Sequence, residues 1–208
     1  MNVEARKYEI VLTSPMLGTV PKNKEVYTKY IAEKGKEARR KSGTGSADVD
    51  REVDTVMEDL EEKGWTGFHY DADSGELFIY NYMLKGMLKA GLEVAMENGR
   101  VKKIAAYKKW CDLLLHVHPR KILLGCNVPD GVLERPLRAS TAQGPRVALA
   151  RSDFVSEGRT LKFGIELLDN NKGLTWDAID EALSFGRYVG LGQWRGSGGY
   201  GQFDVYCR

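Results

Sequence analysis

Cysteine is scarce in this chain, and its placement excludes protein classes that depend on paired thiols. Only three cysteines occur among the 208 residues, at Cys111, Cys126 and Cys207. They form no Cys-x-x-Cys pair, and an odd number of widely spaced thiols argues against a disulfide framework. The sequence therefore predicts a protein of a reducing compartment, and we expect it in the cytoplasm.

Long hydrophobic runs are missing as well. No apolar stretch approaches the ~20 residues that a membrane-spanning helix requires. The N-terminal sequence MNVEARKYEI carries charges where a signal peptide has its apolar core. We expect no membrane contact.

The chain is long enough for one sizeable core, and we expect a single domain over residues 1–208 with a helical insertion at about 22–63.

The chain also lacks a surplus of charge of one sign. It has 31 Lys and Arg residues against 29 Asp and Glu residues, which gives a formal net charge of +2 at pH 7. So balanced a chain has no general attraction for a polyanion. Any contact with nucleic acid must therefore come from local basic clusters.

Metal-ligand sets are incomplete. His116 and His118 form a His-x-His pair without a third ligand nearby in sequence, and a tetrahedral site needs more donors. Asp71, Asp73 and Gly75 have the spacing of part of a calcium loop but lack its distal glutamate. We therefore expect no metal, no cofactor and no catalytic residues. A nuclease that uses the two histidines for acid–base chemistry is the enzymatic alternative.

Strand and helix patterns that are present indicate an α+β fold. Alternating apolar residues predict strands at residues 7–13, 76–80, 146–151, 160–168 and 203–205, with short strands also at 64–70 and 122–126. Helical spacing predicts helices at 24–41, 47–63, 81–96 and 101–117, and a last helix whose N-cap is Thr175. Asn81 is the expected cap of the 81–96 helix, and residues 129–145 are predicted to be irregular. We expect an antiparallel sheet of ferredoxin-like order with helices on one face.

The C-terminal stretch 185–208 contains seven glycines, and it connects a helix pattern to a strand pattern. Glycine permits positive φ angles and close approach of another backbone. Because these glycines leave few side chains to bury, we expect Trp194 and Arg195 to project into solvent. A loop with exposed amides, a cation and a stackable ring suits a phosphate backbone and its bases.

Two further basic features are candidates for phosphate contact. Arg39, Arg40 and Lys41 form a cluster beside the flexible sequence SGTGS. Lys85 lies near the start of the 81–96 helix, where the helix dipole disfavours a cation unless an anion is bound there. We expect Lys85 to lie beside Trp194 and Arg195. The three would then form one phosphate-binding site next to a ring that can stack on a base.

Three stretches, taken in order, resemble a known family. Residues 76–92 contain Leu84-Lys85-Gly86 at the start of a helix, residues 134–168 contain a pair of late strands with Gly158 and Phe163, and residues 190–201 read GLGQWRGSGGYG. This order resembles the RAMP superfamily, the ferredoxin-like RNA-binding proteins of CRISPR effector complexes. The match covers roughly the second two-thirds of the chain, and the cleavage aspartate of the family has no matching position.

The resemblance implies a cytoplasmic, non-catalytic protein of antiviral defense that binds single-stranded nucleic acid, RNA more than DNA. Copies or other subunits would assemble along the strand, as in a backbone subunit of such a complex. The implied phosphate contacts are Lys85, Arg135, Arg138, Arg146 and Arg195, with Trp194 stacking on a base.

A second hypothesis keeps the fold but changes the partner. The chain would then be a structural or inhibitory protein-binding module of a phage or mobile element. Tyr80, Tyr82, Trp194 and Tyr200 would be its anchors, because aromatic residues dominate protein interfaces.

Overall fold

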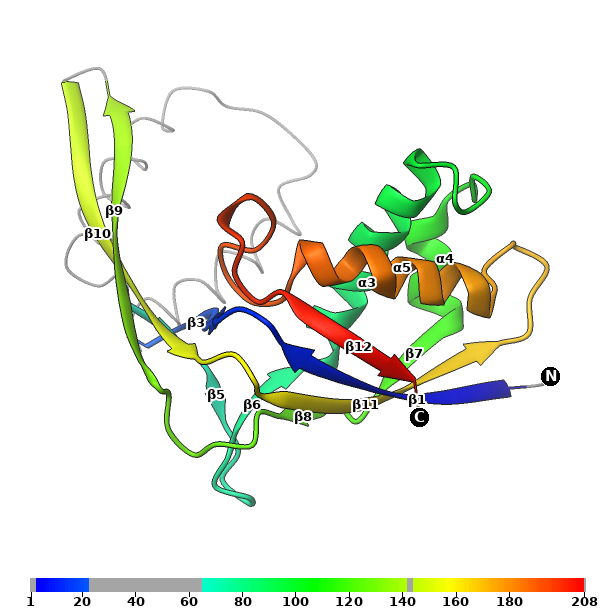
Figure 1. Cartoon of the computed structure of the whole chain (residues 1–208), viewed down its shortest axis with the longest axis horizontal. Coiled ribbons are helices and arrows are strands. Elements are labelled where there is room, and N and C mark those ends of the chain that lie inside the picture. Colours follow the sequence, from blue (N-terminus) through cyan, green and yellow to red (C-terminus); the bar gives the residue numbers. More distant parts are fainter. Residues whose placement is uncertain (1–2, 23–64, 142–143, 208) are drawn as a thin grey trace, which may run out of the picture. The chain divides into compact units, whose positions relative to one another are not determined.

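The computed structural model of the protein describes residues 3–22, 65–141 and 144–207, and the chain divides into two compact units (Figure 1). The first unit comprises Met1–Leu17, Phe68–Asp130 and Phe154–Arg208, and the second comprises Gly18–Gly67 and Gly131–Asp153. The helical insertion expected at about 22–63 lies almost wholly outside the described residues. The single domain expected from the sequence stays a prediction, since a compact unit need not fold separately.

The first unit is built on a four-stranded antiparallel sheet. Its strands are β1 (Val3–Leu12), β7 (Leu115–His118), β11 (Thr160–Leu168) and β12 (Phe203–Cys207), in the spatial order β12-β1-β11-β7. Helix α3 (Asn81–Glu97) lies between β1 and β7 in the chain, and α5 (Trp176–Val189) lies between β11 and β12. This succession of elements and this strand order are those of the ferredoxin-like fold. The predicted fold class is therefore confirmed.

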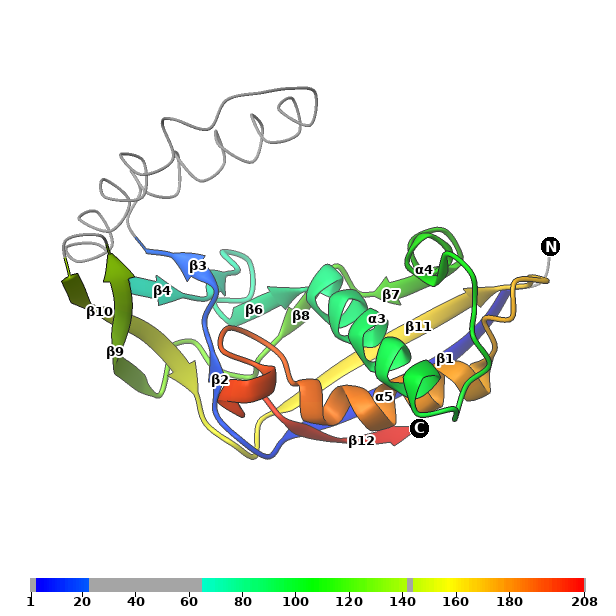
Figure 2. The same cartoon turned by 90° about the horizontal axis from the view of Figure 1, so that it is seen from above.

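Helices cover one face of this sheet (Figures 1 and 2). Leu161, Phe163, Ile165 and Leu167 alternate along β11, and all four are buried in the core together with apolar residues of α3 and α5. Helices α3 and α5 pack closely because both present glycine at the contact. A Cβ on Gly91 would lie only 2.0 Å from the carbonyl oxygen of Ala182.

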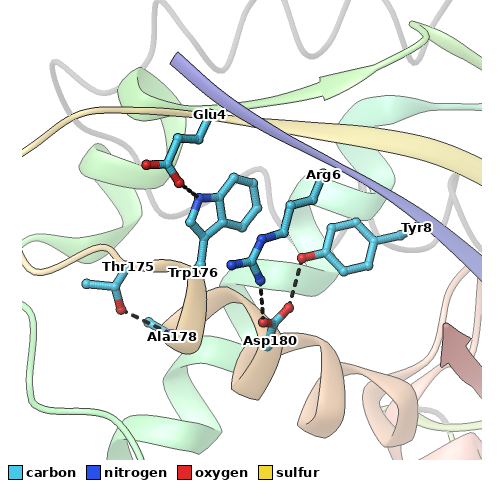
Figure 3. Close-up of polar contacts among 7 residues, drawn as sticks. All are labelled: Glu4, Arg6, Tyr8, Thr175, Trp176, Ala178 and Asp180. Carbon is cyan, nitrogen blue, oxygen red and sulfur yellow. Dashed lines mark hydrogen bonds and ion pairs between the residues drawn. The ribbon is translucent and has the colours of Figure 1, made fainter. Parts of the chain in front are cut away.

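Polar contacts hold the start of α5 against β1 (Figure 3). The Trp176 indole donates to Glu4 (2.6 Å), while the Arg6 guanidinium and the Tyr8 hydroxyl both donate to the Asp180 carboxylate (2.8 Å each). Burial and the hydrogen bond to Asp180 raise the pKa of Tyr8. The helix itself starts as predicted, because the Thr175 hydroxyl accepts from the amide of Ala178.

A smaller antiparallel sheet completes the first unit. It consists of β5 (His69–Tyr70), β6 (Leu77–Tyr80) and β8 (Lys121–Leu123), in the order β5-β6-β8. β6 continues directly into α3. The predicted cap of this helix is wrong: the N-cap residue is Tyr80, and the Asn81 side chain instead donates to the carbonyl oxygen of Val117 (2.7 Å).

The second unit contains β3 (Val20–Pro21), β4 (Trp65–Gly67) and a hairpin of β9 (Gly131–Thr141) with β10 (Gly144–Val155). The last two residues of β10, Phe154 and Val155, belong to the first unit and pair there with β2 (Met16–Leu17). Asp153 is buried, pairs with Lys22 (2.7 Å) and accepts from the Trp65 indole (2.7 Å). Lys22 also lies over the Trp65 ring. These contacts tie the two strands to β10.

Two elements correct the sequence interpretation. Residues 129–145 are not irregular, since most of them belong to β9 and the start of β10. Pro136 and Pro145 favoured a loop, but proline is tolerated on an edge strand and at a strand's start, and among the described strands β9 pairs only with β10.

The helix predicted at 101–117 is much shorter. Helix α4 covers only Tyr107–Leu114, and Leu115 and Val117 then alternate with His116 and His118 in β7. Pairing with β11 overrides the helical pattern there. No helix in the described ranges is both long and apolar enough to cross a membrane.

Candidate functional site

The glycine-rich loop between α5 and β12 is held by backbone hydrogen bonds at its base. The amide of Leu191 donates to Gly201 (2.9 Å), that of Gly201 to Pro15 (2.8 Å), and that of Gln193 to Leu17 (3.1 Å). Gly201 has a φ of 67°, and a Cβ there would lie 1.9 Å from the carbonyl oxygen of Leu191. The predicted close approach of another backbone is confirmed: the two limbs of the loop touch at Gly201, and a Cβ on Gly192 would lie 2.5 Å from the carbonyl oxygen of Leu17, in the segment after β1.

Side-chain contacts fix the far limb of the same loop. The Ser14 hydroxyl donates to the carbonyl oxygen of Gly199 (2.9 Å) and accepts from the amide of Gln202 (2.8 Å). Leu191 is fully buried, so the base of the loop is anchored in the core. The loop is therefore ordered by contacts at both ends.

Trp194 and Arg195 lie in the middle of this loop and are exposed, as predicted. Trp194 is 37% exposed and has a φ of 56°, which is uncommon for a residue with a side chain. Arg195 precedes the short 3-10 helix η1 (Gly196–Gly198) and forms no ion pair with any residue that the structure describes. The loop thus presents a ring and an adjacent cation to solvent.

Lys85 is directed elsewhere. Its ammonium donates to the backbone oxygen of Asp112 near the C-terminal end of α4 (3.2 Å), and partial burial lowers its pKa. Met87, two residues along α3, contacts α5, which leads into the loop, and residues two apart project on nearly opposite sides of a helix. The expected grouping of Lys85 with Trp194 and Arg195 is therefore corrected: the lysine faces α4, whose C-terminal dipole favours a cation.

The other predicted phosphate contacts belong to other parts of the chain. Arg135 and Arg138 lie in β9 and Arg146 lies in β10, so all three belong to one hairpin of the second unit. Arg39, Arg40 and Lys41 lie outside the described residues. The structure brings together Trp194 and Arg195 in one loop, and the three arginines in one hairpin.

The sheet face opposite the helices is polar and partly basic. His116 and His118 project there, because Leu115 and Val117 of β7 point into the core. His118 lies 3.4 Å from the Glu166 carboxylate, and a shallow hollow beside it is lined in part by Lys7 and Lys162.

In the described part of the chain, no three His, Cys, Asp or Glu side chains are grouped as a metal site. Asp71 has the spacing of a calcium-loop residue in the sequence. In the structure its carboxylate accepts hydrogen bonds from Lys121 and Ser74, which lower its pKa.

A ladder of rings crosses the smaller sheet, and we call His69, Phe78, Tyr80 and Tyr82 the aromatic ladder. The ring centroids of His69 and Phe78 are 5.2 Å apart, those of Phe78 and Tyr80 5.1 Å, and those of Tyr80 and Tyr82 5.4 Å. The Arg120 guanidinium lies over the Tyr80 ring, 5.6 Å from its centroid.

Sequence reasoning named Tyr80 and Tyr82 as anchors but missed His69, Phe78 and Arg120. The spacing of two in Phe78 and Tyr80 was the available signal, because alternate residues of a strand share a face. Tyr82 lies beyond the strand, in the first turn of α3. Arg120 lies beside these rings only because β6 pairs with β8, and a single sequence does not show which strands pair.

No family model and no curated protein matches this chain. Among solved structures, one similar chain comes from a cryo-EM structure of the Type III-B Cmr-beta bound to cognate target RNA. The two chains are 11% identical with a TM-score of 0.49, and the match covers 99% of this chain and 60% of the other. This chain therefore spans less than two thirds of that chain's length. So distant a likeness does not establish a shared family or activity.

Proposed function

We propose that the chain binds single-stranded nucleic acid, RNA in preference to DNA, without cleaving it. The observation that carries this proposal is the pair of exposed side chains, Trp194 and Arg195, on a loop anchored at both ends. A ring stacks on any unpaired base, while a neighbouring cation contacts the phosphate that follows it. An anchored loop also loses little conformational freedom on binding.

The positive residues elsewhere support the same function. Lys7 and Lys162 are exposed on the sheet face opposite the described helices, beside His118. The β9–β10 hairpin carries Arg135, Arg138 and Arg146. Local basic groups of this kind supply phosphate contacts in a chain whose net charge is only +2.

The sequence resemblance to the RAMP superfamily supports the finer part of the proposal. It implies RNA as the nucleic acid and assembly with further copies or subunits along the strand, as a backbone subunit. A protein that distinguishes RNA from DNA does so through contacts to the 2′-hydroxyl. Preference for RNA is therefore part of what must be measured.

Binding of a labelled 20-nucleotide RNA and its DNA counterpart, followed by fluorescence anisotropy, tests the proposal. Arg195→Glu is expected to weaken binding through charge repulsion, and Trp194→Ala is expected to weaken it at any salt concentration because stacking is not screened. Arg100→Glu is the matched control, since it makes the same charge change at another exposed arginine of the first unit. Equal losses in Arg195→Glu and Arg100→Glu would remove the loop from the interface.

Incubation of the RNA with Mg²⁺ or Mn²⁺ tests the absence of cleavage. Intact RNA is the expected result. Cleavage that disappears in His116→Ala or His118→Ala would favour the nuclease instead. If the wild-type chain binds neither RNA nor DNA, the protein-binding alternative replaces the proposed function.

A further inference from the structure

The aromatic ladder ends in an exposed ring at a rigid position. Tyr82 is 61% exposed, whereas Phe78 is only 4% exposed. The rings of the ladder therefore range from the buried Phe78 to the exposed Tyr82. Phe78 contributes to packing, but a ring as exposed as Tyr82 gains little from burial. Its stacking on Tyr80, with an interplanar angle of 21°, gives the exposed ring a defined orientation.

The backbone beneath the ladder is fixed. Tyr80 is the last residue of β6, and α3 begins at the next residue. The amide of Asn81 donates to the carbonyl oxygen of Arg120 (2.9 Å), and its side chain donates to that of Val117. Strand pairing places Tyr80 opposite Lys121. These contacts hold Tyr80, Tyr82 and Arg120 in a fixed arrangement, which lowers the ordering cost of binding.

The charge beside the ladder is positive. Lys121 is paired with Asp71, so its charge is balanced within the fold. Arg120 is exposed, lies over Tyr80, and pairs with no carboxylate of the described ranges. Burial lowers the pKa of His69, which keeps that ring neutral at pH 7. Neutral rings with one unbalanced arginine complement a base and its phosphate.

We propose that Tyr82, supported by Tyr80 and His69, stacks on one unpaired base of a nucleic acid strand while Arg120 contacts an adjoining phosphate. This inference rests on the proposed function and adds a second binding site, separate from the loop residues Trp194 and Arg195. The ligand is a single strand, because stacking between an exposed ring and a base requires an unpaired base. That the strand is RNA is taken over from the proposed function.

Substitution of Tyr82 tests the stacking. With a fluorescein-labelled 12-nucleotide oligouridylate, Tyr82→Ala is expected to raise Kd by about 5-fold or more, while Tyr82→Phe keeps the ring and the affinity. Tyr70→Ala is the matched control, because Tyr70 is 62% exposed and lies in β5 next to His69, where strand alternation turns it to the other face. With an abasic oligonucleotide of the same length, the difference between Tyr82→Ala and the wild type should vanish.

A second variant keeps the test decisive if Tyr82→Ala unfolds the chain. Arg120→Ala is expected to weaken binding and to reduce the magnitude of the log–log salt slope by about 0.7, the value for one phosphate contact on a single strand. If Trp194→Ala weakens binding while Tyr82→Ala and Arg120→Ala behave like Tyr70→Ala, this inference is wrong and the proposed function stands. If the wild-type chain binds no RNA, both are wrong.

Discussion

At the scale of single residues, the glycines of the C-terminal loop fall into two kinds. Gly196 and Gly201 both have positive φ angles, 71° and 67°. A Cβ on Gly196 would meet nothing within 4 Å, whereas a Cβ on Gly201 would overlap the Leu191 backbone. Gly196 serves only the local turn, but Gly201 allows the two limbs of the loop to touch.

This difference predicts unequal effects of the same substitution. Gly196→Ala should lower the free energy of unfolding by about 1–2 kcal/mol, the cost of a left-handed alanine. Gly201→Ala should lower it by about 3 kcal/mol or more, because the backbone must also move. Urea denaturation of both variants measures the two values. Equal losses would mean that the limbs of the loop do not depend on their close contact.

Lys85 shows why a positive charge at the start of a helix is weak evidence for a bound anion. The sequence places this cation where the dipole of its own helix is unfavourable, a position that predicts a bound anion. In the structure, the ammonium reaches a carbonyl oxygen near the end of α4 and thus stabilises a neighbouring helix. Nothing in the sequence shows which helix end lies beside a given side chain.

At the scale of elements, helices α3 and α5 pack with their backbones close together. Gly91 lies against the backbone of α5, and Met87 lies against Gly186. Gly86, on the same helix, has open space where its Cβ would be. Helix α3 thus contains one glycine that packing requires and one that it does not.

Alanine at these two positions should have opposite effects. Gly91→Ala should destabilise the fold by several kcal/mol, since helix α5 must move to accommodate a methyl group 2.0 Å from a backbone oxygen. Gly86→Ala should stabilise it by about 0.5–1 kcal/mol through helix propensity. Thermal unfolding distinguishes the two. A destabilised Gly86→Ala variant would contradict the open surroundings of this residue.

The elements that sequence reasoning predicted correctly are those whose own pattern is strong. Strand β11 has strict alternation, and α5 starts at a threonine cap, so local sequence suffices for both. β7 and β9 were missed, since their structure depends on pairing with distant strands. The site follows the same rule: the exposure of Trp194 and Arg195 follows from the glycines around them, whereas Arg120 meets the aromatic ladder only through tertiary structure.

At the scale of the whole molecule, the described helices of the ferredoxin-like arrangement all cover one face of the main sheet, and none of them covers the other. The near balance of charges means that the molecule as a whole does not attract a polyanion. The proposed binding of nucleic acid therefore requires contacts at particular places, for which the glycine-rich loop and the hairpin arginines are the candidates. The number of those contacts is measurable.

The number of phosphate contacts is measured by the salt dependence of binding. Each phosphate neutralised on a single strand contributes about −0.7 to the slope of log K against log salt concentration. With roughly 3–5 such contacts per chain, we expect a slope of about −2 to −3.5, measured by anisotropy between 50 and 500 mM KCl. Trp194→Ala should shift the line downward without changing its slope, because stacking releases no counterions, whereas Arg195→Glu should make it shallower. A slope near zero in the wild type would mean that phosphate contacts do not drive binding, and a protein partner would then be the better explanation of the exposed aromatic residues.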